Sequence, residues 1–315
     1  MSRGVSYSLY ALLVVIWSST WVAIKIGLED SPALLGAGVR FAAAGAVLLA
    51  FAGARRNSLR TDPALAAFIG LFPFAACYGL VYWGEQWIPS GLTAVLFGVM
   101  PLYAALLGGL LLADEPLRAR LLAGVVLSLA GLALAFAESL ELGEEHAALG
   151  AAAVLLSALG AAMGNIAIKR RGTKLDAVVL NGWAMFGGGL LLLAVSAVSE
   201  PWGEAAWTGR AVGSIAYLAI VGSAVAFVIL YILLRHMSAQ SMSFIALLIP
   251  FGALALGALI YDEAITVRAL AGAGLVVAGL LVAQTSGRRE SHKNPTARPI
   301  SSRQASADLW LYDVR

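Results

Sequence analysis

The chain has 315 residues, of which 60% are hydrophobic and 12% are charged, and its formal net charge is +3. A soluble protein of this length carries roughly a quarter of charged residues, so the composition excludes an ordinary water-soluble domain and indicates a surface that faces hydrocarbon. The small net charge gives no support for nucleic-acid binding. Cys77 is the single cysteine and the three histidines share no ligand spacing, so we expect no disulfide, no metal and no cofactor.

Apolar runs long enough to cross a bilayer follow one another along almost the whole chain. A bilayer core about 30 Å thick takes roughly 20 helical residues per crossing, and a helix satisfies its own backbone hydrogen bonds in lipid. The first run is too long for a signal-peptide core, and we expect it to stay as a membrane helix. The sequence predicts an all-α integral membrane protein with ten transmembrane helices, at 7–27, 33–53, 64–83, 91–112, 119–137, 147–168, 177–198, 211–234, 240–261 and 267–285.

Lysine and arginine gather at every second connection between these spans, and acidic residues gather at the others. Since positive residues are enriched on the cytoplasmic side of a membrane, we expect both termini to be cytoplasmic. Only Arg210 and Arg268 depart from the pattern on the outer side. The expected outer acids include Glu29, Glu85, Glu200 and Glu204, and the basic connections lie around 55–60, 118–120, 169–174 and 235.

The two halves of the chain repeat one another. The matches include charged residues and prolines, which are harder to obtain by chance than matches of Ala, Gly and Leu. In the same order in both halves they are Lys25 with Lys169, Tyr82 with Tyr231, Pro101 with Pro250, Asp114-Glu115 with Asp262-Glu263, Gly124 with Gly272, and Gly131 with Gly279.

This repeat predicts the domain organisation. We expect one five-helix repeat over 1–140, a second over 141–285, and a disordered cytoplasmic tail over 286–315, which is rich in serine and arginine. Because each repeat holds an odd number of helices, the second copy enters the membrane from the opposite side. Inverted repeats of this kind place a binding site near the midplane between the halves, and transport proceeds by rocking one half against the other.

Several segments resemble the EamA family of the drug/metabolite transporter superfamily. They are the run from Ile16 to Lys25, the Arg40-Phe41 pair, and the two stretches from Pro101 to Glu115 and from Pro250 to Glu263. The resemblance covers about residues 7–285. It implies a ten-helix carrier of small metabolites in the bacterial inner membrane, similar to exporters of aromatic and other neutral amino acids. The expected partners are a small-molecule substrate and the lipid bilayer, and we expect a monomer.

Arg40 and Lys25 are the cations that lie inside or close to the expected spans. An arginine at membrane depth costs about 2.5–3.5 kcal/mol on insertion scales, so it finds a partner in protein or water. Arg40 either anchors a substrate carboxylate through paired hydrogen bonds or is a structural residue that contacts Glu29, Glu85 or backbone carbonyls. Lys25 is expected to extend its ammonium toward the outer interface.

Aromatic and polar residues within the spans are candidates for the wall of a cavity. Tyr78 and Tyr82 are four residues apart and share one helix face. Pro101 and Pro250 each remove a backbone hydrogen bond inside a helix, and either gate transport or leave a static kink. Plain helix packing is the alternative for each wall residue. The predicted substrate-binding residues are Trp17, Ser19, Arg40, Tyr78, Tyr82, Asn165 and Trp183.

Two further predictions concern residues without a direct substrate role. Gly124, Gly131, Gly272 and Gly279 are expected to allow close helix contact. Glu263 and its counterpart in the first half are expected to cap helices or form salt bridges at helix ends.

The distribution of acids and bases separates the remaining alternatives. No acid precedes Glu29 in the first span and none is expected at mid-membrane, which favours a facilitator or exchanger over an acid-centred proton antiporter. An exchanger of phosphorylated or nucleotide-linked metabolites would need several inward-facing basic residues. A membrane-embedded lipid-modifying enzyme would need convergent His, Asp, Ser or Cys, and a channel would need repeated polar rings. We therefore expect a carrier and not an enzyme.

Overall fold

A computed structural model describes residues 3–56, 58–111, 119–141, 146–172, 175–234, 236–237 and 239–284. Its regular elements over these ranges are all helices. In chain order they are α1 (Arg3–Leu28), α2 (Ala33–Ala54), α3 (Pro63–Ile69), η1 (Gly70–Ala76), α4 (Cys77–Glu85), α5 (Ser90–Phe97), α6 (Met100–Leu111), α7 (Ala119–Glu141), α8 (Ala147–Ala167), η2 (Ile168–Gly172), α9 (Ala177–Ser199), η3 (Trp202–Glu204), α10 (Gly209–Ala219), η4 (Ile220–Val225), α11 (Ala226–Leu234), α12 (Ala239–Tyr261) and α13 (Val267–Gln284).

These elements form ten membrane-spanning segments, as predicted. Seven helical segments are long and apolar enough to cross a bilayer, and three shorter apolar helices, in α7, α12 and α13, complete the set within the described ranges. Two spans are continuous through π-helical turns, α3–η1–α4 and α10–η4–α11, and the α5–α6 span breaks at Gly98–Val99. The fold is therefore the expected all-α membrane bundle. The predicted tail over 286–315 lies outside the described residues.

The two predicted proline positions differ in their local structure. Pro250 lies inside the continuous helix α12, as the sequence predicts. Pro101, in contrast, is the second residue of α6, because the span breaks before it. A proline at the start of a helix removes no intrahelical hydrogen bond, so Pro101 begins a helix where we had predicted an interruption within one. Pro73, which was not predicted to matter, lies within the π-helical η1, where it removes a donor.

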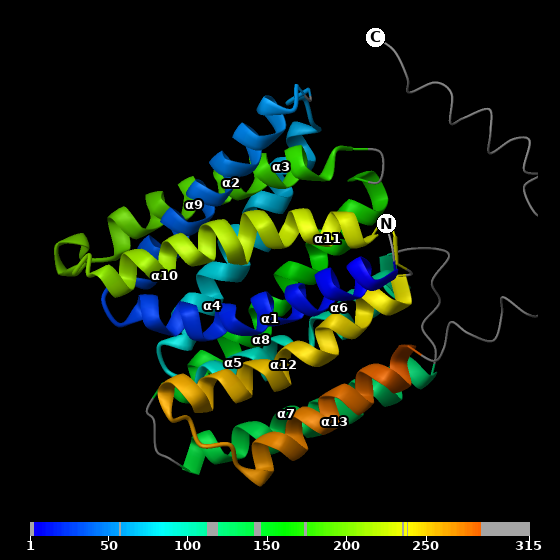
Figure 1. Ribbon diagram of the computed structural model, residues 1–315. Coiled ribbons are helices and arrows are strands. Elements are labelled where there is room, and N and C mark those ends of the chain that lie inside the picture. The colour runs from blue at the N-terminus through cyan, green and yellow to red at the C-terminus, as the bar shows by residue number, and fades with distance from the viewer. Residues whose placement is uncertain are drawn as a thin grey trace, which may run out of the picture.

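The helices pair across the two halves. Figure 1 shows α2 beside α9 at one end of the bundle and α7 beside α13 at the other, with α1, α10 and α12 between them. The first pair joins the second helix of each half and the second pair joins the fifth helix of each half. The α4–α8 contact is likewise mirrored by the α11–α1 contact. This is the arrangement that an inverted repeat produces.

Glycines bring the α7–α13 pair into close contact, as predicted. A Cβ atom on Gly124 would lie 2.5 Å from the carbonyl oxygen of Gly279, and one on Gly131 would lie 2.6 Å from that of Gly272. The reverse contacts from Gly272 and Gly279 are equally short. Since any side chain here would meet backbone, the four glycines set the distance between the two helices.

Three acids at one side of the bundle, Glu29, Glu200 and Glu263, hold helix ends together. We call this side the acidic face and define it by Glu29, Glu85, Glu200 and Glu263; the opposite basic face carries Arg55 and Arg170. The Glu200 carboxylate accepts hydrogen bonds from the backbone N–H groups of Leu34 (2.8 Å) and Leu35 (2.9 Å) at the start of α2. Glu29 pairs with Arg210 at 3.1 Å.

Candidate functional site

A cavity of about 510 Å³ lies between the two halves of the bundle. α1, η1, α4, α5 and α6 line it from the first half, and α8, η2, α9, α11 and α12 line it from the second. Its position agrees with the midplane site that an inverted repeat predicts.

The structure brings some of the predicted residues together at this cavity and places the others elsewhere. Trp17, Tyr78 and Asn165 line the cavity, and so do the two prolines, Pro101 and Pro250. Ser19, Arg40, Tyr82 and Trp183 are not among its lining residues.

The cavity wall is aromatic and uncharged. Its aromatic rings come from both halves, and none of the described residues that line it carries a formal charge. The polar groups are hydroxyls, indole N–H groups and side-chain amides. The aromatic lining residues are Trp17, Trp21, Phe74, Tyr78, Phe97 and Phe227, and the other polar ones are Thr20, Asn165 and Asn181.

Trp21 lines the cavity and carries a buried hydrogen-bond donor without a partner. Its side chain is 7% exposed, and its indole nitrogen has no hydrogen-bond partner in the structure. A buried indole N–H normally has a partner. An orphaned donor on a residue that lines a cavity is therefore a candidate contact for an acceptor on a substrate. Nothing in the sequence favours Trp21 over Trp17, because both lie in the same apolar helix.

Arg40 lies behind the Tyr78 wall and is satisfied by protein groups. The residue is 2% exposed, and it donates to the Ser223 hydroxyl at 3.2 Å and to the Tyr82 hydroxyl at 3.3 Å. Its guanidinium also stacks over the rings of Phe41 and Tyr78, 4.7 and 5.1 Å from their centroids. The partners proposed for a structural role, acids or backbone carbonyls, differ from these observed hydroxyl and ring partners.

A comparable polar pair lies in the second half. The Asn181 amide in α9 donates to the Tyr231 hydroxyl in α11, much as Arg40 in α2 donates to Tyr82 in α4. Tyr82 and Tyr231 are the tyrosines that the repeat aligns. Unlike Arg40, however, Asn181 lines the cavity. Each half thus contributes one tyrosine hydroxyl bonded to a polar residue of its second helix.

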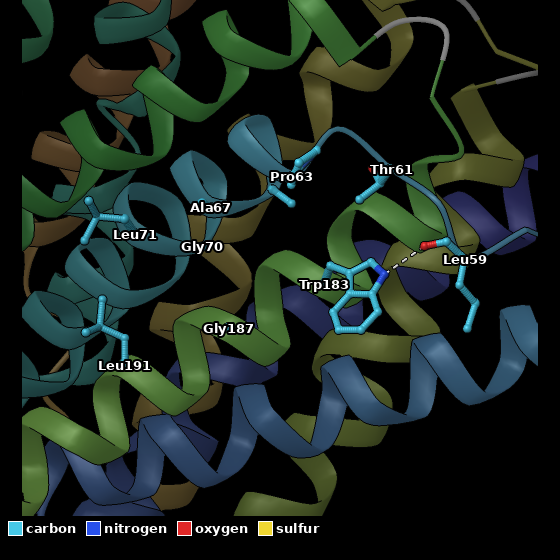
Figure 2. Close-up of a pocket in the computed structure, with 10 residues that line it drawn as sticks. Leu59, Thr61, Pro63, Ala67, Gly70, Leu71, Trp183, Gly187 and Leu191 are labelled. Carbon is cyan, nitrogen blue, oxygen red and sulfur yellow. Dashed lines mark hydrogen bonds between the residues drawn. The ribbon is translucent and has the colours of Figure 1, made fainter.

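Ser19 and Trp183 point away from the cavity. The Ser19 hydroxyl bonds the Tyr217 hydroxyl at 2.6 Å and the Ile16 carbonyl at 2.8 Å, where α1 meets α10. Trp183 is 41% exposed and lies in a separate groove between α3, η1 and α9. Figure 2 shows its indole N–H pointing to the Leu59 carbonyl, 3.0 Å away.

Sequence reasoning missed Asn181 in favour of Trp183, and a signal was present. The two residues are two positions apart on α9, which places them on nearly opposite faces of the helix. Only one of them can face the other half of the protein. The Asn181 amide needs hydrogen-bond partners that lipid cannot supply, so Asn181 is the residue that faces the protein interior.

On α1 and α4, the cavity ends about two helical turns before the acidic face. Toward the basic face it extends to Ile168 and Met242, which lie within about one turn of their helix ends. Toward the acidic face, the furthest lining residues on α1, α4 and α5 are Trp21, Tyr78 and Ala94.

The next turn of each of those three helices forms a closing layer, made of Lys25, Tyr82 and Ser90 with their partners Arg40 and Glu263. Lys25 donates to the backbone carbonyls of Glu85 (2.7 Å) and Ile88 (3.1 Å). The Glu263 carboxylate accepts from the N–H groups of Ser90 (2.8 Å) and Gly91 (3.0 Å). The layer therefore joins both halves across the end of the cavity.

Two expectations for this layer are corrected and one is confirmed. Lys25 does not extend to the interface, because its ammonium turns inward to two carbonyls at the end of α4. Glu85 is not in an exposed outer connection, because it is the last residue of α4 and is 0% exposed. Glu263 does cap a helix, as predicted, and the helix is α5.

The sequence profile of the EamA-like transporter family matches this chain twice, over residues 5–137 and 148–285. The chain belongs to the EamA-like transporter family. Each match covers one half of the bundle, so the profile describes a single five-helix repeat. A carrier of small metabolites is thereby established as its class.

The matches between this EamA-like protein and its named relatives extend over most of both chains. It is 28% identical to the uncharacterized transporter YoaV of Bacillus subtilis over 84% of this chain and 91% of that one. It is 29% identical to the uncharacterized inner membrane transporter YedA of Escherichia coli K12, over 94% of each chain. A probable amino-acid metabolite efflux pump of the same strain is 28% identical over 84% of this chain and 90% of its own.

A solved crystal structure has the same fold. It matches with a TM-score of 0.65 at 20% identity, over 91% of this chain and 99% of its own. The likeness supports the bundle architecture, which is what a similarity at this identity can show.

Proposed function

We propose that this EamA-like transporter carries neutral amino acids, aromatic ones above all, across the bacterial inner membrane as a facilitator or exporter. The observation that supports this most directly is the uncharged aromatic cavity of about 510 Å³ between the halves. Small-molecule sites have volumes of roughly 300–1,000 Å³ and combine apolar walls with a few polar groups, and this cavity has both properties.

The wall chemistry fits a zwitterion with an apolar side chain. The rings of Trp17, Trp21 and Phe227 offer apolar contact area and faces that attract an ammonium group. The free indole N–H of Trp21 is a donor for a carboxylate oxygen. The Asn181 side chain carries an acceptor oxygen for the ammonium. A substrate without net charge needs no ion in the wall, and the described wall contains none.

The same wall argues against the alternatives. A phosphorylated or nucleotide-linked substrate carries negative charges that basic residues would have to balance, and Arg40 is separated from the cavity by the Tyr78 ring. An enzyme that modifies lipids would need a cluster of acid, base or nucleophile side chains. The described lining residues contain no His, Asp, Glu or Cys.

Transport then consists of exposing the cavity to one face and afterwards to the other. In the structure, the closing layer seals the acidic end, while the lining reaches the last turns at the basic end. We assign this conformation as open toward the basic face, which the charge distribution predicts to be cytoplasmic.

Counterflow in proteoliposomes tests the proposal. Purified protein is reconstituted and preloaded with phenylalanine, tryptophan or leucine, and uptake of the labelled amino acid is measured with and without a pH gradient. We expect exchange of aromatic substrates and weaker exchange of leucine. No exchange of any neutral amino acid, in vesicles that contain folded protein, would refute the substrate class.

A matched pair of tryptophan variants tests the site. Trp21→Phe removes the free donor and keeps the ring, and should lower apparent affinity about tenfold or more, as expected for a lost hydrogen bond to a charged group. Trp83→Phe is the control, because Trp83 lies on α4 and is 38% exposed at the bundle surface. Equal affinities for the two variants would remove Trp21 from the site.

A further inference from the structure

Glu85 is a buried acid without a partner. It is the last residue of α4, it is 0% exposed, and neither of its carboxylate oxygens has a hydrogen-bond partner in the structure. An ionised carboxylate in such a place has lost its hydration and gained no donors in return, which costs far more than burying the neutral acid. The geometry therefore favours a protonated Glu85 in this conformation.

The charges around Glu85 do not provide a counterion in contact with it. Lys25 on α1, Glu263 after α12 and Arg40 on α2 are the charged groups that act on it, and the Tyr82 hydroxyl is also near. The other two helices packed on α4, α5 and α8, contain no ionisable side chain.

Each of these groups is already bonded elsewhere. The Lys25 ammonium donates to two backbone carbonyls, and Arg40 donates to Ser223 and Tyr82. Glu263 caps the start of α5, where its carboxylate accepts hydrogen bonds from the N–H groups of Ser90 and Gly91. Lys25 and Arg40 are thus bonded to other acceptors, and no group replaces the hydration that the buried Glu85 carboxyl has lost.

Glu85 also lies at the end of the cavity that the proposed transport cycle has to open. It adjoins the closing layer, since its own backbone carbonyl is one of the two that Lys25 holds. Opening the acidic face separates Lys25, Tyr82 and Ser90 and admits water beside Glu85. The hydrated carboxyl group can then ionise. Glu85 does not line the central cavity, so it can exchange its proton with the acidic side only.

We propose that Glu85 is a proton-binding site that controls the closing layer: it carries a proton while the acidic face is closed and releases it to that side when the face opens. This inference rests on the proposed transport function. Low pH on the acidic side favours closure, and rising pH favours opening. The site senses pH on one side of the membrane without moving protons across it.

Infrared spectroscopy tests the protonation directly. A protonated carboxylic acid has a carbonyl-stretch band separate from those of carboxylates and amides. We expect purified full-length protein in lipid nanodiscs to show this band at neutral pH and Glu85→Gln to lose part of it. The matched control Glu200→Gln should keep the band, because Glu200 accepts three hydrogen bonds. An unchanged band in Glu85→Gln would overturn the proposal.

Cysteine labelling tests the coupling to closure. The reporter is Ile88→Cys in a Cys77→Ser background, because Ile88 is 1% exposed at the closed face. Its rate with a membrane-impermeant maleimide is divided by the rate at an exposed reporter, Glu204→Cys, which corrects for thiol ionisation. Above the ordinary glutamate pKa of about 4.3, the corrected rate should rise by up to about tenfold per pH unit.

The variants decide between the outcomes. Glu85→Gln, a neutral side chain of the same shape, should make the corrected rate low and independent of pH, whereas Glu85→Asp should keep a slope. A flat rate in the wild-type background, or an equal slope in Glu85→Gln, would refute the proposal. Neither measurement uses a substrate, so a failure to transport amino acids would leave both results interpretable.

Discussion

At the residue scale, burial alone does not identify the residues that line the cavity. Arg40 and Tyr78 lie within contact distance, yet only Tyr78 lines the cavity. The Arg40 guanidinium donates hydrogen bonds to two hydroxyls and stacks with its planar face over two aromatic rings. Only a guanidinium combines these contacts, because a lysine ammonium is a point charge that neither forks nor stacks. The residue is thus built into the protein next to the site.

Arg40→Lys should destabilise the protein by about 2 kcal/mol, which is the typical contribution of a hydrogen bond to a charged group. Thermal unfolding of the detergent-purified protein measures the change. Arg210→Lys is the control, because the Arg210 side chain is 65% exposed in its ion pair, and it should change stability by less than about 1 kcal/mol. Similar losses in the two variants would contradict this account of Arg40.

At the element scale, pairs of helices from the two halves hold the bundle together through their glycines. The α7–α13 pair depends on Gly131 and Gly272, and the α2–α9 pair uses the same device. A Cβ atom on Gly189 would lie 2.3 Å from the Ala42 nitrogen, and one on Gly45 would lie 2.4 Å from the Phe186 nitrogen. The two pairs lie at opposite ends of the bundle, and α9 also contributes Asn181 to the cavity wall.

Gly272→Ala should cost about 2 kcal/mol of stability, because its methyl group would overlap the Gly131 carbonyl 2.6 Å away and force the helices apart. Gly274→Ala, two residues further along the same helix, meets nothing within 4 Å. It should be neutral or gain up to about 1 kcal/mol from the better helix propensity of alanine. Melting temperatures of the two variants make the comparison. Equal shifts would show that the close contact does not limit stability.

At the scale of the whole molecule, successive helices cross the membrane in opposite directions, so the acidic and basic connections lie on opposite faces. The acidic face is fastened by contacts between the halves, such as the Glu200 cap on α2 and the Glu263 cap on α5. The orientation of this arrangement in the cell is a prediction of the charge bias, which places the basic face in the cytoplasm.

Cysteine accessibility in intact cells tests that orientation. Glu204→Cys lies exposed on the acidic face and should react with an impermeant maleimide in intact cells. Ser58→Cys lies exposed on the basic face and should react only after the cells are broken. Both variants carry Cys77→Ser, although Cys77 is buried. The reverse labelling pattern would place the acidic face in the cytoplasm.

The sequence by itself determined the architecture, because hydrocarbon imposes strict rules on a chain. Every span must be helical and about 20 residues long, so hydropathy alone located the ten helices. The matched glycines, acids and prolines indicated the repeat, and the repeat predicted a site between the halves. Trp17, Tyr78 and Asn165 line the cavity, and their role in binding substrate stays a prediction.

Only the tertiary structure decided where that cavity ends and which polar groups lie beyond it. Tyr78 and Tyr82 share a helix face, but they differ by one turn in depth, and the cavity stops between them. Glu85 has the sequence context of an exposed connection, and its burial depends on how α1, α2 and α8 pack around the end of α4. Depth and burial arise from contacts between distant segments, and local sequence patterns do not record those contacts.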